Sequence, residues 1–424
     1  MAGMAGATFF ITIIYIFLLK WITKPLLYIS MVLILAVFIL LGGWCWIKKS
    51  SYDPDLEKDN YRYAQIGAFV SWGIGALYLC FMCCCFKQIA LGASIMECAS
   101  EFVSQNIRII ALPVFAYVLS FIFLLFWIAT AVFIWSIGTA EFQPNSPLAN
   151  IKWDDKTRYI MWFFFFGLFW VIAFMICLQQ FMIAAMTCMW YFSGQGSENP
   201  SVEGVSILKA IKWGTWYHCG SIAFGSFIIA VITMIRVVFE YMAKQYEAAN
   251  KENVIAKAVF CCIRCVLYCL DKYVKFITKN AFIQIALNNK NFCSAAWTSF
   301  FLIVRNAGRF GSAAIIGWVM MMLGKGTIMG LSGYITFLVI AYGFPSVQQP
   351  FVPAILIALF SYLVGSLFLS IFSFSCTAIL HCFLLDEETG GTQTTPDSLK
   401  SFLDFTAATD KEKKEDAKDD KKAN

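Results

Sequence analysis

The sequence predicts an all-α, polytopic helical membrane protein with about nine membrane segments and one amphipathic helix in the membrane interface. Of its 424 residues, 60% are hydrophobic and only 14% are charged, whereas soluble domains usually carry about 25% charged residues. Uncharged apolar runs recur along the whole chain, and a helix needs roughly 20 such residues to cross a bilayer. A soluble domain this apolar would lack the polar surface that keeps it in solution.

The apolar segments follow one another from the start of the chain to its charged tail. Their bounds are about residues 7–19, 25–47, 63–86, 109–137, 158–192, 214–240, 297–323, 327–344 and 351–385. Lys20 and Lys24 predict a tight turn between the first two, and polar loops are expected at 48–62 and 141–156. The first residues lack a basic stretch and run into a helix, which indicates a membrane span rather than a cleaved signal peptide.

Residues 1–391 form the expected membrane domain, and residues 392–424 form a charged tail of low hydrophobicity that should be disordered and solvated. Basic residues favour the cytoplasmic side of short loops. If the chain starts outside, this rule places Lys87, Arg108 and the tail in the cytoplasm. The same count of crossings places the lysine-rich residues 241–296 outside, so the count and the basic residues disagree there.

A Cys- and Lys-rich segment, 246–285, contains the predicted interfacial helix. On a helix over 254–280, basic residues share one stripe and apolar residues occupy the opposite side. The basic stripe consists of Lys257, Arg264, Lys272, Lys275 and Lys279, and the cysteines along its border are Cys261, Cys262, Cys265 and Cys269. Four cysteines on one helix do not converge on a zinc ion, and cytosolic thiols stay reduced. We therefore expect lipid headgroups on the stripe and reversible acylation of the cysteines, on the cytoplasmic side.

The sequence offers little from which to build an enzyme. Its two histidines, His218 and His381, lie far apart, and the common metalloprotease, hydrolase and nucleotide-binding motifs are missing from it. We expect no catalytic activity, no metal, no cofactor and no nucleic-acid partner.

Three stretches, in order and spacing, resemble the choline transporter-like family. They are GLFWVIAFMICLQQFMIAAMTCMWYFS (167–193), YHCGSIAFGSFIIAVITMIRVVFEY (217–241) and KNAFIQIALNNKNFCSAAWTSFFLIVRNAGR (279–309), followed by LGK (323–325) and HCFLLDEETGG (381–391). CFKQIALGASIMECAS (85–100) is similar to the family's first loop helix. Typical animal members begin with a further membrane helix and a large extracellular domain. Both are missing from the front of this sequence, which fits either a compact family member or a fragment.

The resemblance implies choline or a related small amine as substrate. A quaternary ammonium has no N–H to donate, so aromatic faces would hold it by cation–π attraction of about 0.5–2 kcal/mol per ring. The aromatic candidates on the matching segments are Trp127, Phe169, Trp170, Trp190, Tyr191, Trp216 and Tyr217. Tryptophan and tyrosine also gather at membrane interfaces for structural reasons. Trp170 and the amide Gln180 differ from that pattern because they lie in mid-span.

Charged candidates lie near the ends of apolar segments. Arg236 and Glu240 have i, i+4 spacing and can pair on one helix face, either in a substrate pathway or at the helix end. A structural or gating role is expected for Arg305, Asn306 and Arg309.

Small residues mark the start of the segment 214–240. Ser221 and Ser226, with Gly220 and Gly225, predict either a narrow face for close helix packing or an unwound helix start that contacts the substrate. His218 is one turn away, and its ordinary pKa would suit proton coupling if transport requires it.

The leading hypothesis is a carrier for choline or a related amine that works by alternating access between the segments 158–192 and 214–240. The alternative is a non-transporting membrane scaffold or a subunit with partners in a larger membrane complex. A membrane enzyme of lipid metabolism is a weaker third hypothesis, because no carboxylate or histidine constellation supports it. Either the plasma membrane or an organelle membrane would suit an integral, multi-pass protein of this kind.

Overall fold

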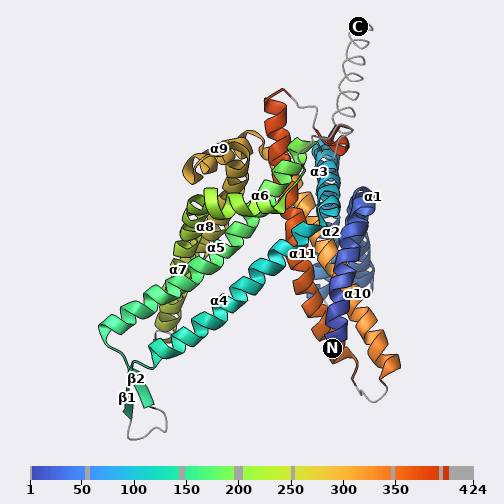
Figure 1. Cartoon of the computed structure of the whole chain (residues 1–424). Coiled ribbons are helices and arrows are strands. Elements are labelled where there is room, and N and C mark those ends of the chain that lie inside the picture. Colours follow the sequence, from blue (N-terminus) through green and yellow to red (C-terminus); the bar gives the residue numbers. More distant parts are fainter. Residues whose placement is uncertain are drawn as a thin grey trace, which may run out of the picture. The chain divides into compact units, whose positions relative to one another are not determined.

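The computed structural model describes residues 2–52, 58–142, 149–194, 204–249, 254–344, 349–390 and 395–400, which are almost entirely helical (Figure 1). The chain divides into two compact units. The first contains α1 (Ala2–Ser50), α2 (Lys58–Cys84), α3 (Phe86–Gln105), α10 (Ala307–Gly343) and α11 (Phe351–Glu388). The second contains α4 (Ala111–Trp135), β1 (Thr139–Phe142), β2 (Ala149–Lys152), α5 (Asp155–Ser193), α6 (Ile207–Lys212), the π-turn η2 (Trp213–Tyr217), α7 (Cys219–Ala249), α8 (Val254–Asn288) and α9 (Phe292–Arg305).

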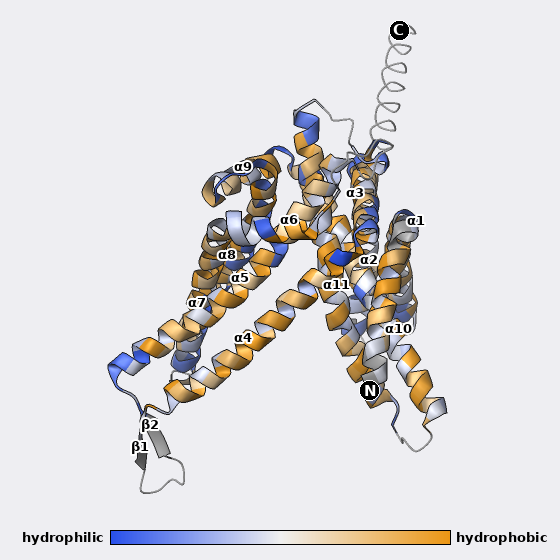
Figure 2. Ribbon diagram, viewed as in Figure 1, coloured by the Kyte–Doolittle hydropathy of each residue, from blue (hydrophilic) through white to orange (hydrophobic). Residues whose placement is uncertain are grey.

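Within the described residues, seven helices are long and apolar enough to cross a membrane. Their spans are Lys24–Ser50, Asp59–Cys84, Ile107–Trp135, Asp155–Ser193, Cys219–Ala249, Ala307–Gly343 and Phe351–Glu388. Two shorter apolar stretches, Gly6–Leu18 and Phe292–Arg305, accompany them. Figure 2 shows α4 as hydrophobic along nearly its whole length. The predicted all-α, polytopic membrane protein is thereby confirmed.

The tight turn predicted at Lys20–Lys24 is wrong, because α1 runs as one helix from Ala2 to Ser50 with Pro25 inside it. Proline removes one backbone hydrogen bond of a helix, a loss that helices in membrane proteins tolerate where neighbouring groups compensate. Lys24 does not mark a loop but forms an ion pair, since its Nζ lies 2.6 Å from Glu97 Oε2 of α3.

The predicted boundary between the segments 297–323 and 327–344 is also wrong. The chain breaks earlier, between α9 and α10, and α10 then continues unbroken through Gly324 and Gly326. Gly324 serves close packing here: a Cβ at this position would lie 2.8 Å from Leu369 Cδ1 of α11. A glycine in an apolar run therefore marks a helix contact rather than a helix end at this position.

In the first unit, α10 packs along α11, α1 packs along α2, and α3 packs against α1, α10 and α11. The described part of the predicted tail, residues 395–400, belongs to this packing. Thr395 Oγ1 donates a hydrogen bond to Asp386 Oδ2 at 2.8 Å, and Leu399 is fully buried. The ordered domain therefore extends past the predicted limit at residue 391, at least to Lys400, and residues 401–424 lie outside the described residues.

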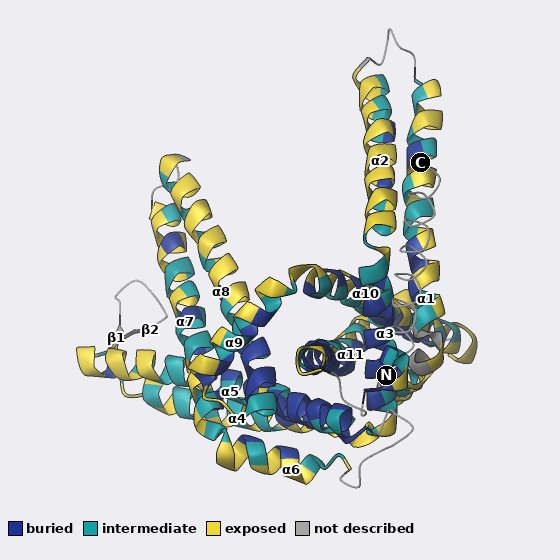
Figure 3. Cartoon of the chain, turned by 90° about the horizontal axis from the view of Figure 1, so that it is seen from above, coloured by how far each residue is buried: buried dark blue, intermediate teal, exposed yellow. Residues whose placement is uncertain are grey.

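In the second unit, the loop predicted at 141–156 forms a short β-hairpin between α4 and α5. Its strands are antiparallel, with Thr139 opposite Lys152 and Phe142 opposite Ala149. Trp153 of this loop contacts Trp135 at the end of α4, with ring centroids 4.7 Å apart. Helices α5, α7 and α8 pack against one another, and α9 packs on α8. Figure 3 shows α7 and α8 lying side by side.

Gly225 allows α7 to approach α8 and α9 closely. A Cβ there would lie 2.7 Å from Phe292 Cε2 and 3.1 Å from both Phe282 Cζ and Thr278 Cγ2. We expect Gly225→Ala to lower the free energy of unfolding by about 1–3 kcal/mol, because extra atoms in a packed contact force neighbours to move. Thermal unfolding of the purified protein in detergent measures the effect. Gly220→Ala is the matched control, since nothing lies within 4 Å of its Cβ position, and an equal effect of both changes would contradict the packing role.

Candidate functional site

The side chains predicted to contact a substrate all lie in the second unit, on α4, α5, η2 and α7. In the structure they fall into separate groups. One is an aromatic cluster between α5 and α7, and another is a charged seam between α7 and α8. The remaining residues are buried in the core or project from η2.

Trp170 is the centre of the aromatic cluster. Its indole Nε1 donates a hydrogen bond to the Ala223 carbonyl of α7 at 3.3 Å. Its ring contacts Phe166, with centroids 6.2 Å apart, and Phe227, with centroids 5.5 Å apart, while those two rings meet each other at 5.6 Å. Trp170 is 38% exposed and Phe227 is 39% exposed. The polar end of the indole is thus fixed, while Trp170 as a whole stays partly exposed.

Two other aromatic candidates, Trp127 and Phe169, lie outside this cluster. Trp127 of α4 stacks on Phe164, with centroids 5.0 Å apart, and donates its Nε1–H to the Phe164 carbonyl at 3.1 Å. This geometry fastens α4 to α5. Phe169 is half-buried on α5.

The C-terminal part of α5 is core rather than surface. Trp190 and Tyr191 are fully buried, and they are the largest fully buried side chains among the described residues. Gln180 is half-buried, whereas its neighbour Gln179 is buried. Full burial leaves Trp190 and Tyr191 no accessible face in this conformation.

Trp216 and Tyr217 project from the π-turn η2, where the His218 N–H reaches the Trp213 carbonyl at 2.9 Å. Trp216 is 81% exposed. π-turns are rare and often occur at functional sites. A cavity of about 520 Å³ lies beside this turn, lined by Lys209, Lys212, Trp213, Tyr217, His218, Ile285, Ala286 and Asn289. Burial lowers the pKa of His218, so its imidazole is neutral at pH 7.

The small residues predicted to form one face of α7 differ in burial and in contacts. Ser226 is buried and donates its hydroxyl to the Ala223 carbonyl at 2.8 Å, the same carbonyl that accepts from Trp170. Ser221 is half-buried. Gly225 makes the close contact described above. α7 is regular helix from Cys219 onward, so an unwound start is found only in η2.

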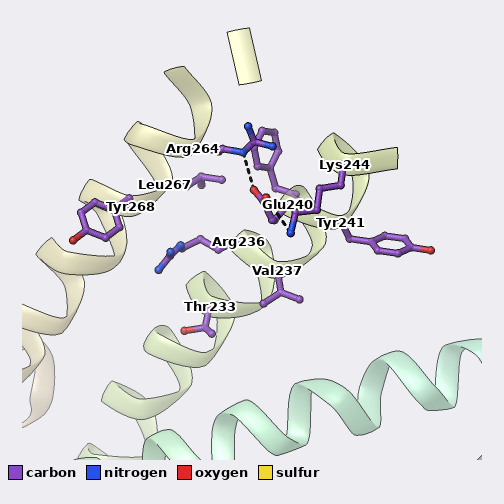
Figure 4. Close-up of a pocket in the computed structure, with 10 residues that line it drawn as sticks. Thr233, Arg236, Val237, Glu240, Tyr241, Lys244, Arg264, Leu267 and Tyr268 are labelled. Atoms are coloured by element: carbon purple, nitrogen blue, oxygen red, sulfur yellow. Dashed lines mark hydrogen bonds and ion pairs between the residues drawn. The ribbon is translucent and has the colours of Figure 1, made fainter. Parts of the chain in front are cut away.

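Arg236 and Glu240 do not pair with each other as their spacing suggested, because each has a nearer partner on α8. Arg236 Nη1 donates to Asp271 Oδ2 at 2.8 Å. Arg264 Nε donates to Glu240 Oε2 at 2.7 Å (Figure 4). Arg264 also reaches Glu247 at 3.1 Å. Oppositely charged side chains therefore alternate along this charged seam and fix the register of the two helices.

Asp271 is the site residue that sequence reasoning missed. It is 3% exposed and accepts hydrogen bonds from Arg236 and from Lys275, whose Nζ lies 2.9 Å away. One signal was available: Asp271 is the sole acidic residue between Val254 and Asn288. A single carboxylate among many cations is a candidate for a buried ion pair.

The prediction that the whole basic stripe of α8 faces lipid headgroups is wrong for two of its residues. Helix α8 forms as expected, but Arg264 points into the seam with α7 instead of toward lipid headgroups. Lys275 likewise contacts Asp271. The border cysteines Cys261, Cys262, Cys265 and Cys269 are all exposed, so their acylation stays a prediction.

A groove of about 680 Å³ opens on the charged seam. Its lining consists of Thr233, Arg236, Val237, Phe239, Glu240, Tyr241, Lys244, Arg264, Leu267 and Tyr268. Figure 4 shows Arg264 and Lys244 directed toward Glu240, while Tyr241 points away from it. Three cations and one carboxylate line this groove, and two of those cations also pair with carboxylates beside it, Arg236 with Asp271 and Arg264 with Glu247.

The candidates at the end of α9 lie where the chain passes from the second unit to the first. Arg305 is exposed in the last turn of α9, and Asn306 precedes α10. Arg309 forms an ion pair with Glu387 of α11, which joins the ends of two helices in the first unit. This pair supports a structural role for Arg309.

Together, these features define the class of the protein. It is an integral, multi-pass helical membrane protein whose spans carry an ion-paired seam and an anchored aromatic cluster.

A family profile described as plasma-membrane choline transporter matches residues 69–388, and the chain belongs to this family. It is 26% identical to mouse choline transporter-like protein 1 over 401 residues, which cover 91% of this chain and 59% of the relative. It is also 26% identical to human choline transporter-like protein 3, over 96% of this chain and 62% of the relative. Choline transporter-like protein 2 of Dictyostelium discoideum is 27% identical over 78% of this chain and 52% of its own length. The chain thus spans about three fifths of the length of the mouse and human relatives.

Proposed function

We propose that the protein carries choline or a related small amine across its membrane by alternating access. Membership of the family supports a membrane transporter. The observation that carries the substrate class is the cluster of Phe166, Trp170 and Phe227, in which the indole N–H is already bonded and Trp170 is 38% exposed. A quaternary ammonium is attracted to such faces and needs no hydrogen-bond acceptor.

The depth of the cluster fits a substrate carried through the membrane. Trp170 lies about 22 Å along α5 from Asp155, at 1.5 Å per residue, and so falls within the apolar part of the span Asp155–Ser193. The two cavities described above suit a cation less well, because cationic side chains line each of them. The larger has Arg236, Lys244 and Arg264 among its ten lining residues, and the smaller contains Lys209 and Lys212.

We further infer that α8 is an eighth crossing. Its 35 residues extend about 52 Å, more than the roughly 30 Å of a bilayer core. Two of its charged residues, Arg264 and Asp271, face α7, where they are paired. Lys257 and Lys272 are exposed, as is Val266, of which 65% is exposed. Ionisable residues in membrane helices usually face a neighbouring helix and pair in this way.

This crossing removes the conflict over residues 241–296. The crossings then alternate through Lys24–Ser50, α2, α4, α5, α7, α8, α10 and α11. The β-hairpin, the C-terminal end of α7 and the N-terminal end of α8 lie on one side. Helices α3, α6 and α9 lie on the other side, with Lys87, Arg108 and Lys290. The basic residues identify this second side as cytoplasmic.

Trp170→Ala is expected to weaken the apparent affinity for choline by about 2- to 30-fold, the equivalent of about 0.5–2 kcal/mol of cation–π attraction. Uptake of labelled choline into proteoliposomes, measured against concentration, gives KM and the maximal rate separately. Trp170→Phe keeps an aromatic face and should fall between the wild type and Trp170→Ala.

The matched control is Trp162→Ala, which removes a 42% exposed tryptophan from the same helix. It should leave KM unchanged. An equal KM for Trp170→Ala and the wild type would contradict the aromatic site while leaving transport intact. No choline uptake by correctly folded wild-type protein would contradict the carrier and favour the scaffold or complex subunit.

A further inference from the structure

A second cysteine cluster lies at the end of α2. Cys80, Cys83, Cys84 and Cys85 fall within six residues, in the sequence CFMCCCF. Helix α2 ends at Cys84, and α3 begins at Phe86. The side chains of Cys80, Cys83 and Cys84 are exposed, and Cys85 is half-buried. These thiols therefore stand on the surface at the last turn of a membrane span.

Two ordinary roles for clustered cysteines do not fit this arrangement. Cys80 Sγ and Cys84 Sγ lie 3.9 Å apart, whereas a disulfide bond is about 2.05 Å long. All four thiols are free. Among the described residues, no group of three or more histidine, cysteine or acidic side chains is arranged to hold a metal ion.

The surroundings of the thiols are apolar. Leu77 lies two turns before Cys84 on the same face of α2 and is 73% exposed, and Phe81 is exposed between them. Side chains on a helix tilt toward its N-terminus. On α2, the N-terminal direction leads from Cys84 back along the span. A chain attached to Cys84 would therefore run over Leu77 into the hydrocarbon.

The α8 cysteines lack this geometry. Cys269, the last of them, lies about 28 Å of helix before Asn288 at 1.5 Å per residue. It is level with the seam rather than with the cytoplasmic end of α8. The side chains also tilt toward Val254, away from the cytoplasm in the proposed order of crossings. An acyl donor in the cytoplasm would reach the α2 cluster and not this one.

We propose that the α2 cluster, Cys80, Cys83, Cys84 and Cys85, is S-acylated by a long-chain fatty acid. The thiolate sulfur attacks the carbonyl carbon of a fatty acyl-coenzyme A. The new thioester C–S bond forms as the bond to coenzyme A breaks, and coenzyme A leaves with the proton that the cysteine lost. No atom changes oxidation state. The inference rests on the proposed order of crossings but not on the proposal that choline is transported.

The test uses the full chain expressed in a eukaryotic host that is fed an alkyne-bearing long-chain fatty acid. Labelling of the wild type is compared with that of two variants: Cys80→Ser/Cys83→Ser/Cys84→Ser/Cys85→Ser, and the matched change of the four α8 cysteines to serine. Hydroxylamine releases label that is held as a thioester. We expect this releasable label to fall to background in the α2 variant and to persist in the α8 variant. Restoring Cys84 alone in the α2 variant should return a single labelled site, which separates loss of the site from loss of folding.

Label that disappears only with the α8 cysteines would overturn the proposal and favour acylation of Cys261–Cys269. An unlabelled wild type would overturn it as well. Choline uptake by the same preparations reports separately on the proposed function, because a carrier without acyl groups would still transport.

Discussion

Removing both cations that contact Asp271 is expected to destabilise the protein by about 3–5 kcal/mol, the usual effect of leaving a buried charge uncompensated. The double variant is Arg236→Met/Lys275→Met. Asp271 is 3% exposed, and its carboxylate would then lose both the Arg236 and Lys275 contacts, at 2.8 and 2.9 Å. The two methionines keep most of the apolar stem of each side chain, so lost packing contributes little. The free energy of unfolding in mixed detergent micelles measures the change.

Two controls separate the buried charge from other effects. Adding Asp271→Asn to the double variant removes the uncompensated carboxylate and should recover most of the lost stability. Lys272→Met removes a neighbouring exposed lysine whose Nζ lies 5.4 Å from the Tyr268 ring, and it should change stability by less than about 0.5 kcal/mol. If the triple variant is as unstable as the double variant, the cost lies in the cations themselves and not in Asp271.

The same seam shows why the sequence predicted helices better than contacts. The segments 158–192 and 351–385 agree closely with α5 (Asp155–Ser193) and α11 (Phe351–Glu388), because hydropathy alone determines where such long helices lie. Hydropathy does not determine which charged side chains form ion pairs. The i, i+4 spacing of Arg236 and Glu240 allowed a local pair, but the alignment of α7 with α8 brings nearer partners from about 25–35 residues away.

Helix ends were hard to predict for a related reason. Glycine often marks turns and loops, and charged residues are costly inside a membrane span. The sequence therefore indicated boundaries at Lys20–Lys24 and between the segments 297–323 and 327–344. In the structure, Lys24 pairs with Glu97, and Gly324 admits Leu369 from α11. Both contacts join residues on different helices. Local pattern therefore cannot distinguish a break from a close packing point.

The aromatic candidates divide by burial, which composition cannot supply. Trp170 and Trp190 lie on the same predicted segment and have the same chemistry, and both matched the family's pattern. Trp170 stays partly exposed beside Phe227, and Trp190 is fully buried. We therefore expect a change at Trp170 to affect substrate affinity and a change at Trp190 to affect folding. Trp190→Ala tests the expectation for Trp190.

Trp190→Ala is expected to act on folding and not on substrate affinity. Trp190 is fully buried, and truncation of a buried tryptophan to alanine usually costs about 3–5 kcal/mol. The yield of folded protein and its thermal unfolding temperature should both fall. The KM for choline, measured on the fraction that folds, should match the wild type.

Trp216→Ala is the control for Trp190→Ala. Trp216 is also a family-matched tryptophan but is 81% exposed, so its loss should change stability by less than about 0.5 kcal/mol. Trp190→Phe refills part of the cavity and should recover part of the stability. A raised KM for Trp190→Ala at unchanged stability would show that the core opens during transport and that Trp190 meets the substrate there. The two tryptophans would then belong to two conformations of one pathway, and Trp170 alone would not account for recognition.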